Sequence, residues 1–172
     1  IYVLLDMHQD LYCPLFGGNG MPEWTALDDP AVPNQVNSGD WYMNYANQDV
    51  RDSFDRFYTD EELQAAYAEN WIRVIERVKA YPNVIGYDLI NEPWIGNSLP
   101  WEFEEKRLLP FYEKLVARIR EVDPDRPIFL EPSPLNVNSG LPSLMPTPTD
   151  PNVVYTPHYY DPLMVLEKPY DN

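Results

Sequence analysis

Val84-Ile85-Gly86-Tyr87-Asp88-Leu89-Ile90-Asn91-Glu92-Pro93 is the stretch of sequence that decides the fold. Its first seven residues form a short, mostly apolar run, which is typical of a strand buried on both faces in a parallel sheet. The run ends in two polar residues, Asn91 and Glu92. It therefore predicts a buried strand over residues 84–90 with polar side chains at its carboxyl end.

The rest of the chain alternates between similar strands and helices. Further buried strands are predicted over residues 1–7, 128–130 and 153–155. A capping-box pattern, with Thr59 as N-cap and Glu62 three residues later, predicts a helix that runs to about Tyr81. A second helix is expected to start at Pro110 and to end near Val122. Two segments without sustained periodicity are expected to be long loops: residues 11–58 and 133–151.

This alternation of buried strands and helices indicates a parallel α/β sheet. No glycine-rich phosphate loop follows any strand, which disfavours a nucleotide-binding sheet. In a (β/α)8 barrel the carboxyl ends of the strands converge on the face that holds the active site. The polar residues expected to share that face are His8, Asp10, Asn91, Glu92, Glu131, His158 and Tyr160.

Eight strands normally take about 250 residues, and this chain of 172 residues yields four predicted strands. The predicted fold class is therefore α/β, an incomplete (β/α)8 TIM barrel. We expect residues 1–172 to form part of a single barrel, with strands 1–2 and 7–8 outside this chain. The opening Ile1-Tyr2-Val3 also lies inside a predicted strand, without an initiator Met or a charged leader, so any signal peptide is expected upstream.

The composition limits what the chain can bind. Asp and Glu number 28 against 12 Lys and Arg, which gives a formal net charge of −16. Such a charge repels nucleic acid and anionic lipid head groups, but it does not repel a neutral sugar. No run approaches the roughly 18 apolar residues of a transmembrane segment. The single Cys13 excludes an internal disulfide framework and a multi-cysteine metal site.

Glu92 has the clearest catalytic chemistry among the strand-end residues. A carboxyl group in a crowded barrel mouth can be desolvated enough to stay protonated and to donate to a leaving-group oxygen. Asn91 beside it can hydrogen-bond a sugar hydroxyl. The alternative is a glutamate at a surface strand-to-loop junction that bonds nearby backbone, and the tripeptide alone does not separate the two.

Three motifs, in the predicted strand order, resemble those of glycoside hydrolase family 5, a family of the cellulase-like clan. Residues 85–94, Ile-Gly-Tyr-Asp-Leu-Ile-Asn-Glu-Pro-Trp, resemble the end of family strand 4, where the acid/base glutamate follows an asparagine. Residues 4–10, Leu-Leu-Asp-Met-His-Gln-Asp, resemble the end of strand 3. Residues 155–160, Tyr-Thr-Pro-His-Tyr-Tyr, resemble the His-x-Tyr motif of strand 6, so the resemblance spans essentially the whole chain.

The resemblance implies a retaining glycoside hydrolase without a cofactor or metal, in which Glu92 is the general acid/base. The residues implied to bind substrate are His8, Asp10, Asn91, His158 and Tyr160. The family nucleophile is a glutamate on strand 7, outside this chain, so this chain alone is expected to be inactive and poorly stable. Glu131 matches strand 5, and we expect it to contact sugar or to support the structure.

The motif wording is most similar to the endoglycoceramidase-like subgroup, which implies cleavage of the β-glycosidic bond between a glycan and a ceramide or sterol. Trp24, Trp41 and Tyr42 in the long segment 11–58 would then build an apolar rim for the lipid, or else belong to a packed surface loop. A carbohydrate or glycolipid substrate implies an extracellular or cell-envelope location.

Two other functions stay open on sequence alone. A metal-dependent barrel hydrolase would use His8, Asp10, Glu92 and His158 as ligands, although the His-x-His pair common in such barrels is absent. A non-catalytic carbohydrate-binding barrel would keep the fold without its chemistry. A missing glutamate on strand 7 would indicate this second case.

Overall fold

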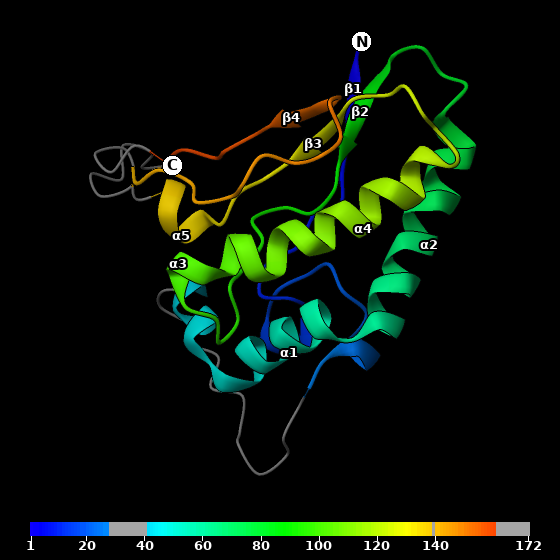
Figure 1. Ribbon diagram of the computed structural model, residues 1–172. Helices are drawn as coiled ribbons and strands as arrows, with labels where there is room; N and C mark the ends of the chain where they lie inside the picture. Colours follow the sequence, from blue (N-terminus) through cyan, green and yellow to red (C-terminus); the bar gives the residue numbers. More distant parts are fainter. Residues whose placement is uncertain (28–40, 139, 161–172) are drawn as a thin grey trace, which may run out of the picture.

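Four parallel strands form the sheet of the computed structural model, which describes residues 1–27, 41–138 and 140–160 (Figure 1). The strands are β1 (Val3–Asp6), β2 (Val84–Asp88), β3 (Ile128–Leu130) and β4 (Val153–Tyr155). They lie in the order β1-β2-β3-β4, and each neighbouring pair is parallel. The predicted parallel α/β sheet is confirmed, and it has the sequential strand order of a barrel.

Two of the predicted strands coincide with the observed ones, and the other two are longer than the observed strands. Residues 128–130 and 153–155 match β3 and β4, whereas the runs 1–7 and 84–90 pair over fewer residues than predicted. Gly86 makes room for the Phe129 ring, because a Cβ atom at Gly86 would lie 2.2 Å from Cε2 of Phe129. Any larger residue at this position would have to displace this ring.

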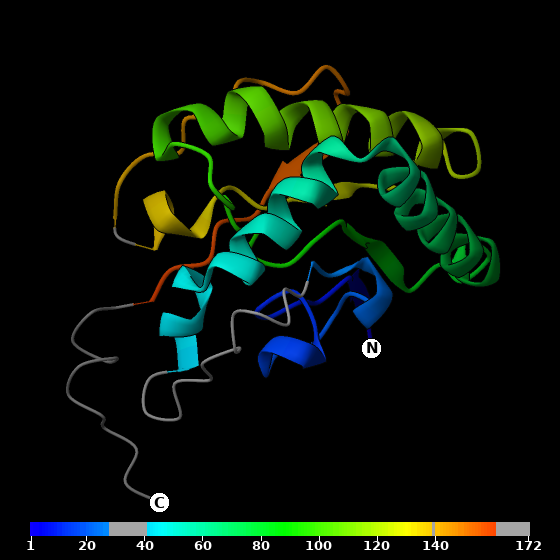
Figure 2. The same ribbon diagram turned by 90° about the horizontal axis from the view of Figure 1, so that it is seen from below.

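Two long helices cover one side of the sheet, α2 (Glu61–Val78) and α4 (Leu109–Arg120), and they pack against each other (Figure 2). The Tyr67 hydroxyl and the Trp71 indole of α2 both donate to the carbonyl oxygen of Leu89, at 2.7 and 3.1 Å. Leu89 follows β2 directly and precedes Glu92 by three residues. The outer helix layer therefore fixes the backbone that leads to Glu92.

A third helix, α1 (Gln48–Thr59), lies in the segment that the sequence predicted to be a long loop. Its buried side chains include Val50, Phe54, Phe57 and Tyr58, which have helical spacing. The prediction was wrong because this stripe is short and is flanked by Gly, Pro and Asn. The part of the predicted loop at residues 28–40 lies outside the described residues.

The predicted capping residue was wrong by one position. Thr59 is the last residue of α1, and its hydroxyl donates to the carbonyl of Asp55 at 2.7 Å. The N-cap of α2 is Asp60, whose carboxylate accepts from the backbone N–H groups of Glu62 and Leu63 at 3.0 and 3.2 Å. The N–H group of Leu63 is the leading cause of the lowered pKa of Asp60.

The helix expected to start at Pro110 begins ten residues earlier. Helix α3 (Pro100–Phe103), a π-helical turn (Glu104–Leu108) and α4 follow one another without a break. Proline has no N–H to donate, and the π turn just before Pro110 accommodates that missing bond. Helix α5 (Pro134–Val137) is a single turn inside the segment predicted as an irregular loop.

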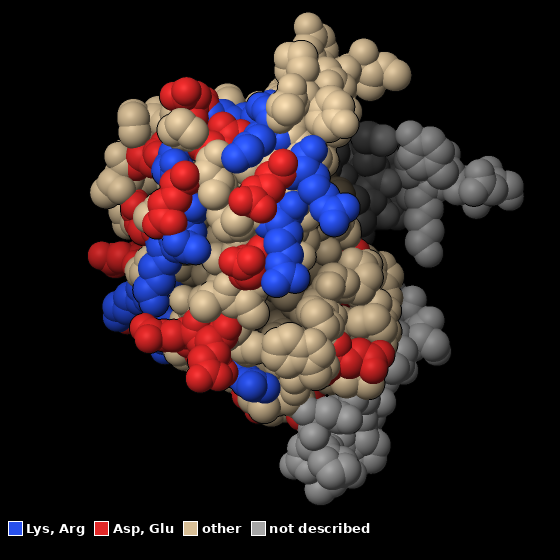
Figure 3. Space-filling model, turned by 90° about the vertical axis from the view of Figure 1, so that its right-hand side faces the viewer, with Lys and Arg blue, Asp and Glu red and all other residues tan. Residues whose placement is uncertain are grey.

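The surface of the helix layer carries both signs of charge. On the face shown in Figure 3, Lys and Arg side chains lie among Asp and Glu. The two helices also carry the ion pairs Arg73–Glu69 on α2 and Lys114–Glu61 between α4 and α2. Within the described part of the chain, no helix is long and apolar enough to cross a membrane.

Candidate active site

Glu92 lies directly beyond the carboxyl end of β2 in a strained backbone conformation. Its φ is +41°, in the left-handed region that residues other than glycine rarely adopt. Side chains hold the peptide groups on both sides of it. Glu131 accepts the Glu92 N–H at 2.8 Å, and Gln9 donates to the carbonyl oxygens of Asn91 and Glu92 at 2.9 and 3.1 Å. These contacts offset the strain and set the direction of the Glu92 side chain.

Three side chains from later in the chain converge on one oxygen of the Glu92 carboxyl group. Nδ1 of His158 lies 2.9 Å from Oε1, and the Tyr160 hydroxyl donates to the same oxygen at 2.9 Å. Asn138 donates to it at 3.5 Å. The structure therefore brings His158 and Tyr160 together with Glu92, and it argues against a merely surface-bonded glutamate.

The Glu92 carboxyl group affects the phenol group of Tyr160, which donates to it. Burial, followed by the hydrogen bond to Glu92 and the nearby acidic charges, raises the pKa of Tyr160 to about 12. Tyr160 therefore stays protonated and remains a hydrogen-bond donor throughout the physiological pH range.

His8 lies between two carboxylates at the end of β1. Its Nδ1 is 2.9 Å from Asp6 and its Nε2 is 3.2 Å from Asp10. Partial burial alone would lower the pKa of His8, but these hydrogen bonds and charges outweigh it and raise the pKa above its usual value. His8 is thus held between Asp6 and Asp10, one carboxylate at each ring nitrogen.

Asn91 is buried, and its side-chain NH2 donates to the backbone carbonyl of Gln9 at 2.9 Å. The bond joins the loop after β2 to the loop after β1. Together with the bonds from Gln9 to the peptide groups around Glu92, it locks the two strand ends to each other. The side-chain amide of Asn91, which was predicted to bind substrate, therefore already donates a hydrogen bond to the protein backbone.

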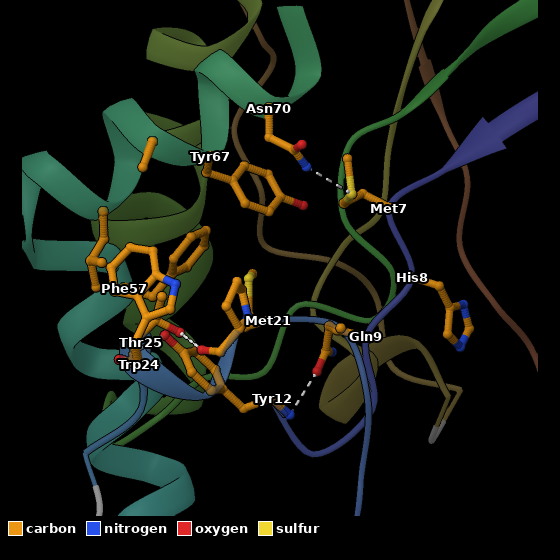
Figure 4. Close-up of a pocket in the computed structure, with 14 residues that line it drawn as sticks. Met7, His8, Gln9, Tyr12, Met21, Trp24, Thr25, Phe57, Tyr67 and Asn70 are labelled. Atoms are coloured by element: carbon orange, nitrogen blue, oxygen red, sulfur yellow. Dashed lines mark hydrogen bonds between the residues drawn. The ribbon is translucent and has the colours of Figure 1, made fainter. Parts of the chain in front are cut away.

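A cavity of about 300 Å³ lies beside Gln9 (Figure 4). Its walls are mainly apolar and come from the β1 end, the following loop, α1 and α2, and they include Met7, Met21 and Phe57. In Figure 4 the imidazole of His8 points away from these side chains. Trp24 also lines this cavity, and 68% of its surface is exposed.

Three carboxylates meet at the carboxyl ends of β1, β2 and β3. Asp6, Asp88 and Glu131 each place an oxygen within 4.8 Å of the others, and in the described residues this is the only such group of three or more potential metal ligands. The four residues of the metal-hydrolase alternative, His8, Asp10, Glu92 and His158, do not form such a group. The observed group differs from the predicted one in every member.

Burial and repulsion favour protons on two of these carboxyl groups. Desolvation, followed by the charges of Asp88, Asp6 and Glu92, raises the pKa of Glu131 to about 9, although the hydrogen bond from the Glu92 N–H opposes the rise. Desolvation followed by the Asp6 charge raises the pKa of Asp88 to about 7. Glu131 is therefore a neutral carboxylic acid at pH 7.

Sequence reasoning missed the contacts of Gln9 and Asn138 with Glu92, and it left Glu131 without a defined partner. A signal for Glu131 was present: Glu131-Pro132 ends its strand as Glu92-Pro93 follows β2. Asn138 had no such signal, because it lies in an irregular segment and reaches Glu92 only through the tertiary fold.

The fold and the site place the chain in the class of (β/α)8 barrels that carry an Asn-Glu pair at the end of a strand. The chain matches the family described as Cellulase (glycosyl hydrolase family 5) over residues 1–168. It belongs to this family, and its matched relatives are endoglycoceramidases.

An endoglycoceramidase of Hydra vulgaris is 32% identical over 159 residues, which cover 76% of this chain and 31% of that protein. Endo-glycoceramidase II from Rhodococcus sp., solved as a ganglioside GM3 complex, is 31% identical with a TM-score of 0.87 and covers 99% of this chain and 42% of its own. The same enzyme was solved as a lactosyl-enzyme intermediate, with 33% identity, a TM-score of 0.83 and coverage of 92% and 40%. The chain spans about a third of the length of its curated relatives.

Proposed function

We propose that the full-length protein is a retaining glycoside hydrolase that cleaves the β-glycosidic bond of glycolipids, with Glu92 as general acid/base. The observation that carries this proposal is the convergence of His158 and Tyr160 on Glu92 Oε1. A carboxyl group held at one oxygen can present the other, Oε2, to the leaving-group oxygen of the substrate. His8 and Asp10, whose side chains remain partly exposed, would bind sugar hydroxyls.

The second carboxyl group of a retaining site must lie about 5–5.5 Å from the first and must face the sugar. Glu131 does not meet this requirement, because it is buried and its two oxygens lie against the Glu92 N–H and the His158 imidazole. We infer that the nucleophile is a glutamate on family strand 7, outside this chain. The lactosyl-enzyme intermediate of the Rhodococcus enzyme supports double displacement, since only retaining enzymes form a covalent glycosyl-enzyme.

A glycolipid substrate is supported by the relatives and by the surface. The Hydra and Rhodococcus relatives are endoglycoceramidases, and one was solved with ganglioside GM3. Trp24, Trp41 and Tyr42, which were predicted to form an apolar rim, are 68%, 54% and 55% exposed. Exposed aromatic rings suit a substrate with a lipid tail. Because glycolipids are membrane components, we infer an extracellular or cell-envelope location.

The substrate class is tested by incubating the full-length protein with glucosylceramide, lactosylceramide and steryl glucoside in detergent micelles, and with cello-oligosaccharides. We expect release of intact glycan from one or more of the glycolipids. A Glu92→Gln preparation controls for contaminating activity. Hydrolysis of cello-oligosaccharides alone would replace the glycolipid proposal with a β-glucanase, and no hydrolysis of any substrate would favour a non-catalytic barrel.

A further inference from the structure

Glu131 contacts Glu92 by two separate routes. Its Oε2 accepts the backbone N–H of Glu92 at 2.8 Å. Its Oε1 lies 3.2 Å from Nε2 of His158, and the other ring nitrogen of His158 lies 2.9 Å from Glu92 Oε1. One buried side chain from the end of β3 thus contacts both the main chain and, through an imidazole, the carboxyl group of Glu92.

We propose that Glu131 is a positioning residue for Glu92: it holds the strained Glu92 peptide directly and orients the Glu92 carboxyl group through His158. This inference rests on the proposed role of Glu92 as acid/base. It goes beyond that role because it makes proton donation depend on a residue that cannot reach the substrate. Glu131 is 2% exposed, and Tyr112 of α4 holds its backbone carbonyl at 2.9 Å.

The protonation state of Glu131 follows from the charges around it. The ionisable groups that face it are Asp6 of β1, Asp88 of β2, Glu92 and His158. Burial and the acidic neighbours raise the pKa of Glu131 to about 9, so it carries a proton at neutral pH. A neutral Glu131 accepts the Glu92 N–H and lies against His158 without adding a negative charge beside the Glu92 carboxyl group.

The inference is tested with two variants of Glu131 in the full-length protein. Glu131→Gln keeps an acceptor for the Glu92 N–H and a donor for His158, so it mimics the protonated acid. Glu131→Met has a similar size but removes the acceptor for the Glu92 N–H and the polar contact with His158. The matched control is Glu104→Met: Glu104 is also fully buried, but it bonds the N–H of Ser133 and the hydroxyl of Ser143. Each variant is assayed on a glycolipid and on an activated aryl glycoside, whose leaving group needs no proton.

We expect Glu131→Met to lower kcat/KM for the glycolipid by roughly 10- to 100-fold and for the aryl glycoside by less than about threefold, because kcat/KM reports the first step and only the glycolipid needs a proton from Glu92 in that step. Glu131→Gln should stay within about threefold of wild type on both substrates at pH 7. Glu104→Met should affect both substrates equally. Equal losses in Glu131→Met would overturn the positioning role.

A pH profile keeps the inference testable if Glu131→Met does not fold. On the aryl glycoside, kcat includes hydrolysis of the glycosyl-enzyme, in which Glu92 acts as general base. Wild-type kcat should fall as the pH rises through about 9, where Glu131 becomes negatively charged beside Glu92 and His158. Glu131→Gln cannot ionise and should stay level over this range. An identical fall in both proteins would contradict the inference. Assays of Glu92→Gln separate the positioning role of Glu131 from the acid role of Glu92. If Glu92→Gln lowered kcat/KM equally for the glycolipid and the aryl glycoside, Glu92 would not be the acid.

Discussion

Glu92→Gln in the full-length protein should lower kcat/KM for glycolipid hydrolysis by about 10²- to 10⁴-fold, the usual contribution of a general acid. Glutamine keeps the size of the side chain and can still contact His158 and Tyr160, but it has no proton to give to a ceramide alkoxide. An activated aryl glycoside leaves without protonation, so the rate of its glycosylation step should fall by less than about tenfold.

Pre-steady-state release of the aryl group measures this first step separately from the hydrolysis of the glycosyl-enzyme. The thermal midpoint of the variant serves as the control for folding. Equal losses on the glycolipid and on the aryl glycoside would count against proton donation by Glu92.

The second large effect concerns stability. Trp71→Ala should lower the free energy of unfolding of the full-length protein by about 3–5 kcal/mol, the range for removing a large aromatic from a core. Trp71 is 1% exposed, it packs near Tyr87 with ring centroids 5.8 Å apart, and its indole donates to Leu89. Its removal leaves a cavity beneath the strand that leads to Glu92.

Urea unfolding followed by circular dichroism measures the change. The matched control is Trp101→Ala on α3, because Trp101 is 64% exposed and its loss should change the free energy of unfolding by less than about 0.5 kcal/mol. Equal stability of the two tryptophan variants would contradict a stabilising role for the packing of Trp71 of α2 against β2.

Strands and site motifs were predictable from the sequence where the physical signal is local. Buried strands such as residues 128–130 show as apolar runs, and polar residues such as His8 and Glu92 show where those runs end. Helix boundaries were less predictable because neighbouring residues compete for the same role. Thr59 and Asp60 are both good N-caps, and tertiary packing selected Asp60.

The contacts inside the site were the least predictable part. Glu131 is 39 residues from Glu92 and His158 is 66 residues away, and the sheet order alone brings them together. The strained φ of Glu92 also has no signature in the sequence, because the contacts that hold it come from Gln9 and Glu131. The sequence predicted only that Glu131 contacts sugar or supports the structure. The fold places its buried side chain against Glu92, the proposed acid/base.

Azide rescue tests the central claim, that Glu92 is the acid/base of a retaining site, most directly. In Glu92→Ala, azide can enter the space left by the carboxyl group and attack the glycosyl-enzyme without needing a general base. With an aryl β-glycoside as substrate, we predict that azide accelerates turnover and that NMR shows a β-glycosyl azide. No acceleration, or an α-glycosyl azide, which would mark Glu92 as the nucleophile, would contradict the account.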